Sequence, residues 1–255
     1  MKNRLKILNI WVDLVTRGEA VDIVHSFLNG GSRPHSIFAS NPEKNFSVSK
    51  DSDLLEAYKN ADLLLPDGIG VVAAANLLYN ANLKRNPGSE FIFDICKLAE
   101  EEGYKVYCYG SKEEDNKKAV EALKNRYPKL NIAGRSNGYV KDDDMFELIE
   151  RINRSNAEIL FLAMGSPKQE KWFATYKDSL THVRVVQGIG GTLDTIAGNV
   201  KRAPEFWLTH NIEWLYRLLS EPKRIRRQKV LPVFALLVLI EWLKMKLGFS
   251  HKPIQ

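Results

Sequence analysis

The feature that most constrains the fold of this 255-residue chain is a regular alternation of two kinds of segment. Short apolar runs typical of strands alternate with segments that have the 3.6-residue periodicity of helices. Strands are predicted at 5–10, 36–39, 62–65, 104–109, 130–133, 158–163 and 183–187, and helices at 16–28, 51–60, 70–81, 89–102, 113–126, 143–154 and 168–176. This alternation indicates βαβ units, and therefore an α/β fold with a Rossmann-like, largely parallel sheet flanked by helices.

The C-terminal segment differs in composition from the rest of the chain. Residues 201–255 carry 11 Lys and Arg against 4 Asp and Glu, whereas residues 1–200 carry 26 against 27. A basic cluster at 223–229 is followed by the apolar run 230–240, which is shorter than the roughly 20 residues of a membrane-spanning helix. We therefore predict an α/β core at 1–200 and a helical appendage at 201–255 that lies on an anionic membrane surface. Docking of the apolar helix on the core, or on a second subunit, is the alternative.

Four polar loops leave predicted strands: SNPEKN at 40–45, PDGIG at 66–70, GSPKQE at 165–170 and GIGG at 188–191. Ligands of parallel sheets bind beyond the carboxyl ends of the strands, so these loops are the candidate site. Asp67 is placed to act as a general base, or to cap the helix that follows it. Asn41 could orient a substrate hydroxyl, or form an Asx turn before Pro42.

The two later loops are candidates for binding an anion. Backbone N–H groups near Gly188, Gly190 and Gly191 could approach a nucleotide diphosphate, and Gln169 adds a neutral donor and acceptor. The same residues also fit a purely structural interpretation, in which Ser166 caps a helix that begins at Pro167. The glycine pattern is not that of a dinucleotide fingerprint, so a nicotinamide cofactor is not expected.

Neither a metal site nor a cofactor is predicted. The acidic patterns Asp51-Ser-Asp53 and 142–144 stand at the polar starts of predicted helices, where carboxylates complement the helix dipole. Without a metal, arginines would have to balance the charge of a leaving diphosphate. Cys96 and Cys108 have neither metal-ligand nor disulfide spacing, which indicates a reducing, cytoplasmic compartment.

Six blocks in order along the chain resemble the WecG/TagA/CpsF glycosyltransferase family: SNPEKN, PDGIG, GSPKQE, GIGGTLDTIAG, KRAP and EWLYRLLSEPKRIRR. The resemblance implies a metal-independent, inverting transfer of N-acetylmannosamine, its uronic acid or a related hexose. The donor would be a UDP-sugar and the acceptor a polyprenyl-diphosphate-linked sugar. The protein would act peripherally at the cytoplasmic face of the membrane, in the synthesis of a bacterial surface polysaccharide such as teichoic acid or exopolysaccharide, and small homo-oligomers would be compatible with the family.

The resemblance also implies roles for individual residues. Asp67 matches the catalytic base, and Asn41, Arg85 and Gln169 match residues around the substrates. The residues that match the family's C-terminal arginines, which lie over the diphosphate when the appendage closes, are Arg217, Arg224 and Arg227.

One position departs from the family. Where the family often has a Thr, two residues before the motif Asn, this chain has Ala39 followed by Ser40, so a hydroxyl contact is lost or displaced by one residue.

Two hypotheses from other classes compete with this interpretation. The basic stretch 223–229 could bind nucleic acid, although such binding would not need the apolar run that follows, and the core is slightly acidic. The protein could also be a non-catalytic membrane scaffold in which Asp67 and Gln169 merely begin helices. We expect no nucleic-acid partner.

Overall fold

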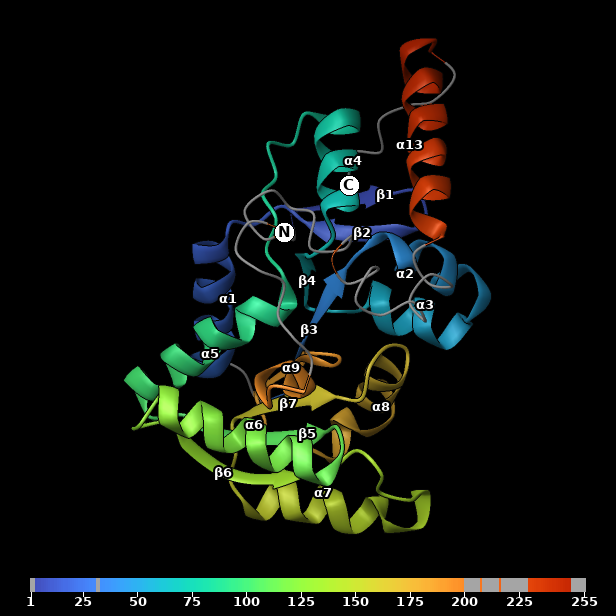
Figure 1. Cartoon of the computed structure of the whole chain (residues 1–255). Helices are drawn as coiled ribbons and strands as arrows, with labels where there is room; N and C mark the ends of the chain where they lie inside the picture. The colour runs from blue at the N-terminus through green and yellow to red at the C-terminus, as the bar shows by residue number, and fades with distance from the viewer. Residues whose placement is uncertain (1–2, 31–32, 200–206, 208–215, 217–228, 249–255) are drawn as a thin grey trace.

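The computed structural model describes residues 3–30, 33–199, 207, 216 and 229–248. A six-stranded sheet forms its centre, with every neighbouring pair of strands parallel and the order β4-β3-β8-β7-β5-β6 (Figure 1). The strands are β3 (His35–Ser40), β4 (Leu63–Pro66), β5 (Lys105–Gly110), β6 (Asn131–Ser136), β7 (Ile159–Ala163) and β8 (Val185–Gly188). The predicted Rossmann-like parallel sheet with flanking helices is confirmed.

Helices bury both faces of this sheet, which explains why its central strands are apolar almost throughout. All five residues of β7, for example, are buried. One core layer packs against α1 (Arg17–Gly30), α5 (Gly88–Glu102), α6 (Glu113–Arg126) and α9 (Thr192–Ile196). The opposite layer packs against α2 (Pro42–Ser47), α3 (Ser52–Lys59), α4 (Ile69–Tyr79), α7 (Met145–Arg154), α8 (Lys168–Tyr176) and α13 (Val230–Lys246).

The N-terminal strand prediction was wrong. Residues 5–10 do not form one strand of the main sheet; β1 (Arg4–Ile7) and β2 (Ile10–Asp13) form an antiparallel hairpin of their own. The chain reverses at Leu8 and Asn9, and Leu8 adopts a φ of 54°. A positive φ is uncommon for a leucine, so sequence preferences did not indicate the turn.

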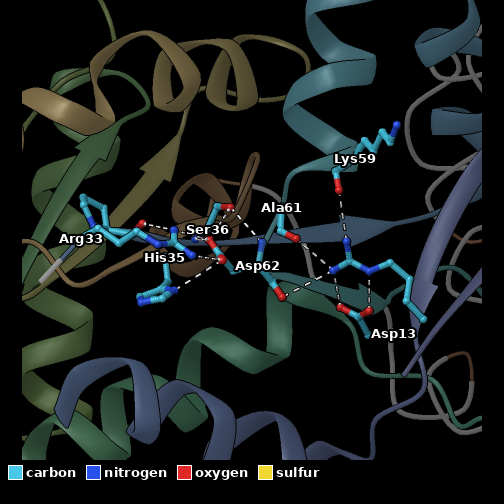
Figure 2. Close-up of polar contacts among 9 residues, drawn as sticks. Asp13, Arg33, His35, Ser36, Lys59, Ala61 and Asp62 are labelled. Carbon is cyan, nitrogen blue, oxygen red and sulfur yellow. Dashed lines mark hydrogen bonds and ion pairs between the residues drawn. The ribbon is translucent and has the colours of Figure 1, made fainter. Parts of the chain in front are cut away.

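Two aspartates with largely covered side chains tie the hairpin and the edge strand β4 to the neighbouring segments (Figure 2). The Asp13 carboxylate accepts hydrogen bonds from Arg4 Nε at 2.6 Å and from the Leu64 N–H at 2.7 Å. Asp62, just before β4, accepts from Arg33 Nη2 at 2.6 Å and from the Ser36 N–H at 2.9 Å. These contacts fix the amino ends of β3 and β4, on the side of the sheet away from the candidate site.

The apolar C-terminal run forms α13, which lies beside α4 in Figure 1 and packs against both α4 and α2. Phe234 and Val238 are buried in this contact, whereas large apolar side chains elsewhere on the helix and at its C-terminal end are exposed. Those exposed residues are Val233, Leu236, Leu237, Leu239, Ile240, Leu243 and Leu247. Among the described residues, no helix combines the length and the apolar character that crossing a membrane requires.

Candidate active site

The four loops singled out in the sequence follow four neighbouring strands, β4, β3, β8 and β7, at the carboxyl edge of the sheet. They surround one cavity of about 830 Å³, a volume within the range of small-molecule sites. Its lining includes seven of the predicted site residues: Asn41, Asp67, Arg85, Gln169, Gly188, Gly190 and Gly191. The remaining predicted residues, Arg217, Arg224 and Arg227, lie outside the described residues.

Asp67 is held at the start of α5, and not by the helix that directly follows it in the chain, α4. The following helix α4 has Gly68 as its N-cap and no side-chain cap, so the capping alternative for Asp67 is wrong. Its Oδ1 instead accepts a hydrogen bond from the Gly88 N–H, at 3.1 Å, at the first residue of α5. Arg85 Nε donates to the Asp67 carbonyl at 2.7 Å, which fixes the backbone. The first turn of a 15-residue helix thus orients the Asp67 carboxylate at the cavity wall.

The Asn41 loop and the Asp67 loop are in close contact, and two glycines make this contact sterically feasible. A Cβ on Gly68 would lie 2.7 Å from Pro42 Cδ, and one on Gly70 would lie 2.8 Å from Pro42 Cγ. Asn41 itself caps α2, since its Oδ1 accepts from the Lys44 N–H at 3.2 Å. The side chain of Asn41 therefore forms a helix cap, with a bond three residues along the chain, and not the predicted Asx turn. The same residue lines the cavity.

Gln169 links the two remaining loops. Its side chain is buried, and its Oε1 accepts a hydrogen bond from the Gly190 N–H at 3.0 Å. This N–H therefore joins the two loops, and Gly190 also lines the cavity, as predicted for a residue beside the substrate. Gly188 lies directly under the same amide, because a Cβ there would be 2.5 Å from Gln169 Nε2. Gly191, the N-cap of α9, lines the cavity with its backbone.

A buried ion pair joins the SNPEKN and GSPKQE loops. Lys44 Nζ donates to Glu170 Oε1 and to Ser166 Oγ, and the two charged side chains are only 6% and 1% exposed. Ser166 is therefore a partner of Lys44 and not the cap of α8, whose N-cap position is Pro167. Lys44 Nζ also lies 5.5 Å from the centre of the Tyr58 ring, a cation–π distance.

The departure at Ala39 removes a hydroxyl group from the cavity. Ala39 lines the cavity, whereas Ser40 is fully buried and its Oγ donates to the Trp11 carbonyl at 2.7 Å. Successive strand residues point to opposite faces, so Ser40 does not replace the missing contact. Burial raises the pKa of the neighbouring Tyr58 phenol, which stays protonated and donates to the Ala39 carbonyl at 3.1 Å.

The acidic patterns have structural roles. Asp51 caps α3 by accepting from the Leu54 N–H at 3.1 Å, and Lys171 Nζ lies 2.8 Å from Asp51 and 3.6 Å from Asp53. Residues 142–144 form a short 3₁₀ turn before α7. Within the described parts of the chain, no three His, Cys, Asp or Glu residues are grouped as metal ligands would be.

Comparison with known proteins agrees with this arrangement of motifs. The model of the glycosyl transferase WecG/TagA/CpsF family matches residues 5–248. The chain belongs to this family. Two relatives are named N-acetylglucosaminyldiphosphoundecaprenol N-acetyl-beta-D-mannosaminyltransferase. The protein of Bacillus subtilis (strain 168) is 37% identical over 217 residues, which cover 85% of this chain and 83% of the relative. That of Bacillus spizizenii (strain ATCC 23059 / NRRL B-14472 / W23) is 34% identical over 203 residues, or 80% and 78%.

Membership in the WecG/TagA/CpsF family identifies the protein as an enzyme, a glycosyltransferase. The predicted class of activity is therefore confirmed. The primary function of this chain is catalytic, and is neither scaffolding nor the binding of nucleic acid.

Sequence reasoning missed two parts of the site of this glycosyltransferase. The first is the Lys44–Glu170 pair, whose partners are 126 residues apart. Both belong to motifs that were recognised, but a charged residue in a motif is more often exposed, and no local pattern indicates burial. The second is the cavity wall made by α13, which consists of Leu231, Phe234, Ala235, Val238 and Leu239. Their spacing of three and four residues places them on one helix face, but the run 230–240 is apolar on every face, so the sequence does not indicate which face lines the cavity.

Proposed function

We propose that this protein transfers N-acetylmannosamine, its uronic acid or a related hexose from a UDP-sugar to a polyprenyl-diphosphate-linked acceptor sugar. The names of the two relatives support this activity, because they describe N-acetylmannosamine transfer to N-acetylglucosaminyldiphosphoundecaprenol. The observation that carries the proposal is that Asp67 and the other motif residues surround one cavity in a chain so similar to those transferases. Assembly of a surface polysaccharide such as teichoic acid would use the product.

Asp67 is the proposed general base. In a single displacement, the acceptor hydroxyl loses its proton to the Asp67 carboxylate while its oxygen bonds to the anomeric carbon of the donor. The bond from that carbon to the diphosphate oxygen breaks on the opposite side, so the configuration inverts and UDP leaves. The Gly88 N–H orients the carboxylate, and Arg85 holds the backbone from which it projects.

Asn41, Gln169 and the glycine loop are proposed to position the sugars and the diphosphate. Asn41 and Gln169 line the cavity from opposite loops, and Gly191 brings backbone to its wall. The charge that develops on UDP is proposed to be met by Arg217, Arg224 and Arg227, because guanidinium groups bind phosphate oxygens through two parallel hydrogen bonds. Transfer would then need no metal ion.

The appendage at 201–255 is proposed to hold the α/β core at 1–200 on the cytoplasmic face of the membrane. Its excess of Lys and Arg suits an anionic leaflet, and the exposed apolar side of α13 suits the headgroup–acyl boundary. A polyprenyl acceptor is itself confined to the bilayer. The appendage could close over the site of its own chain or of a neighbouring subunit.

The proposal is tested by incubating the full chain with UDP-N-acetylmannosamine and N-acetylglucosaminyl-diphosphoundecaprenol in detergent micelles that contain EDTA. We expect a disaccharide lipid whose new linkage has the opposite anomeric configuration to that of the donor. Other UDP-hexoses, tested in parallel, identify the preferred sugar. Absence of transfer from every UDP-sugar would contradict the proposed activity, and a strict requirement for Mn²⁺ would contradict metal independence.

A further inference from the structure

One end of the cavity is polar and the other is apolar. The catalytic motifs form the polar end, whereas the apolar end lies between α4 and α13. On α4 the lining residues are Ile69, Gly70, Ala73, Ala74 and Leu77. On α13 they are Leu231, Phe234, Ala235, Val238 and Leu239. Each set recurs at three- and four-residue spacing, so each helix presents a single apolar stripe to the cavity.

We propose that this α4–α13 groove binds the first isoprene units of the lipid-linked acceptor. The inference rests on the proposed function, because that function supplies the acceptor. It goes further by placing the start of the lipid chain against the protein, with only the rest of the chain in the bilayer. The ligand class is a branched, unsaturated hydrocarbon attached to a diphosphate.

The dimensions and the packing of the groove suit a narrow hydrocarbon chain. Each stripe covers eight residue steps, which corresponds to about 12 Å of helix at 1.5 Å per residue. Alanine side chains at 73, 74 and 235 leave space between the helices, while Phe234 and Val238 are buried at its base. A wall of this kind offers no hydrogen-bonding side chain, so it favours an apolar ligand over a second sugar.

The apolar groove continues directly into the polar end of the cavity. A Cβ on Gly70 would lie 2.8 Å from Pro42 and 3.8 Å from the Phe234 ring, so Gly70 marks the junction between the Asn41 loop and α13. Asp67 lies three residues before Gly70, at the start of the same loop. A diphosphate-linked sugar at Asp67 would therefore have its lipid end directed along α4 and α13.

The rim of the groove is apolar and accessible. Ile69, Leu77 and Leu239 are 37%, 43% and 50% exposed, although each is a large hydrophobic side chain. Contiguous exposed apolar surface of this kind is typical of a ligand or membrane contact. The outer side of α13 is apolar as well, so a lipid leaving the groove at this helix would meet the surface that we assign to the bilayer.

The test combines variants that fill the groove with a large side chain and acceptors that differ in the length of their lipid. Ala73→Trp and Ala235→Trp place bulk in the groove at positions whose side chains are exposed, so folding should tolerate them. Ile240→Trp is the matched control, since Ile240 is 40% exposed on α13 but does not line the cavity. Transfer from UDP-N-acetylmannosamine is measured with two acceptors that share the N-acetylglucosaminyl diphosphate head. One carries undecaprenol and the other a methyl group.

We expect the two groove variants to raise KM for the undecaprenyl acceptor at least about tenfold, because a few lost methylene contacts suffice for such a change. The preference for undecaprenyl over methyl acceptor, as a ratio of kcat/KM, should fall by the same factor and should be retained in Ile240→Trp. A photoreactive diazirine on the second isoprene unit should label peptides that contain 69–77 or 231–239.

An unchanged preference in both groove variants, or labelling confined to other peptides, would overturn the inference and leave the groove to a segment of this chain or to a second copy. If the unaltered protein transfers sugar to neither acceptor, the proposed function itself has failed. Vesicle sedimentation, which should be equal for all the variants, separates groove binding from membrane association.

Discussion

The buried Lys44–Glu170 pair permits a quantitative prediction about stability. Lys44→Met removes the cation and leaves the Glu170 carboxylate, 1% exposed, without its counter-charge. The second oxygen, Glu170 Oε2, already has no hydrogen-bond partner among the described residues, so little nearby can compensate. Removing one member of a buried pair typically costs about 3–5 kcal/mol. That is a large share of the roughly 5–15 kcal/mol by which a domain is stable.

The double variant Lys44→Met/Glu170→Met should recover most of this loss. An apolar pair of similar volume carries no desolvation cost, and such replacements are often neutral or stabilising. Methionine at 44 would also keep a contact with the Tyr58 ring, which the lysine now approaches to 5.5 Å. The two single variants and the double variant form a cycle from which the coupling energy is obtained.

Urea unfolding at pH 7, followed by tryptophan fluorescence, is the assay. Lys171→Met is the control, because this lysine pairs with Asp51 at the surface and its removal should have a much smaller effect. A loss below about 1 kcal/mol for Lys44→Met would refute the account of the pair as buried and uncompensated. So would a double variant as unstable as the sum of the two single variants.

Three further predictions concern the core and the ends of the sheet. Gly188→Ala should cost about 1–3 kcal/mol in urea unfolding, because the new methyl group would overlap a buried amide. Gly191→Ala should cost far less, because a Cβ there would meet only Asp194 Oδ2, at 3.4 Å. Burial raises the pKa of Asp62, but the hydrogen bonds from Arg33 and from the Ser36 N–H have the larger effect, so the pKa of Asp62 is lowered in the folded protein. The ionised carboxylate therefore stabilises the fold at pH values above its unfolded pKa of about 4. The stability deficit of Asp62→Asn should therefore be constant near neutral pH and shrink as the pH falls through the folded pKa; a deficit that grows in acid would contradict this. Burial raises the pKa of Cys108 to about 12, and that of Cys96 well above its usual value, so neither thiol should react with iodoacetamide at pH 8 before urea unfolds the protein.

The sequence predicted the elements that depend on periodicity. Five of the six strands of the main sheet lie within one or two residues of their predicted ranges, whereas β6 ends three residues beyond its range, and turn residues explain several helix ends. Helix α5, for example, ends at Gly103 with a φ of 79°, and α4 ends at Asn80 with a φ of 54°. Both residue types tolerate the left-handed conformation, so these ends are encoded locally.

The contacts within the site could not be predicted from local pattern. Asp67 reaches the start of α5, 21 residues later, because β4 and the turn before α5 are brought together by the fold. The Gly190 N–H likewise donates to Gln169 because the fold places β7 and β8, the strands before these two residues, next to each other. Patterns along the chain identified which loops form the cavity, but the partner of each polar group depends on strand order.

Asp67→Asn is the substitution that shows whether the Asp67 carboxylate is the base of the sugar transfer. Asparagine keeps the shape and can still accept from the Gly88 N–H, but it cannot take a proton from the acceptor. With UDP-N-acetylmannosamine and N-acetylglucosaminyl-diphosphoundecaprenol, we expect kcat to fall on the order of 100-fold or more. Urea unfolding and the KM values should stay close to those of the unaltered protein, and Asp51→Asn should retain full turnover. Turnover by Asp67→Asn at the rate of the unaltered protein would contradict the account.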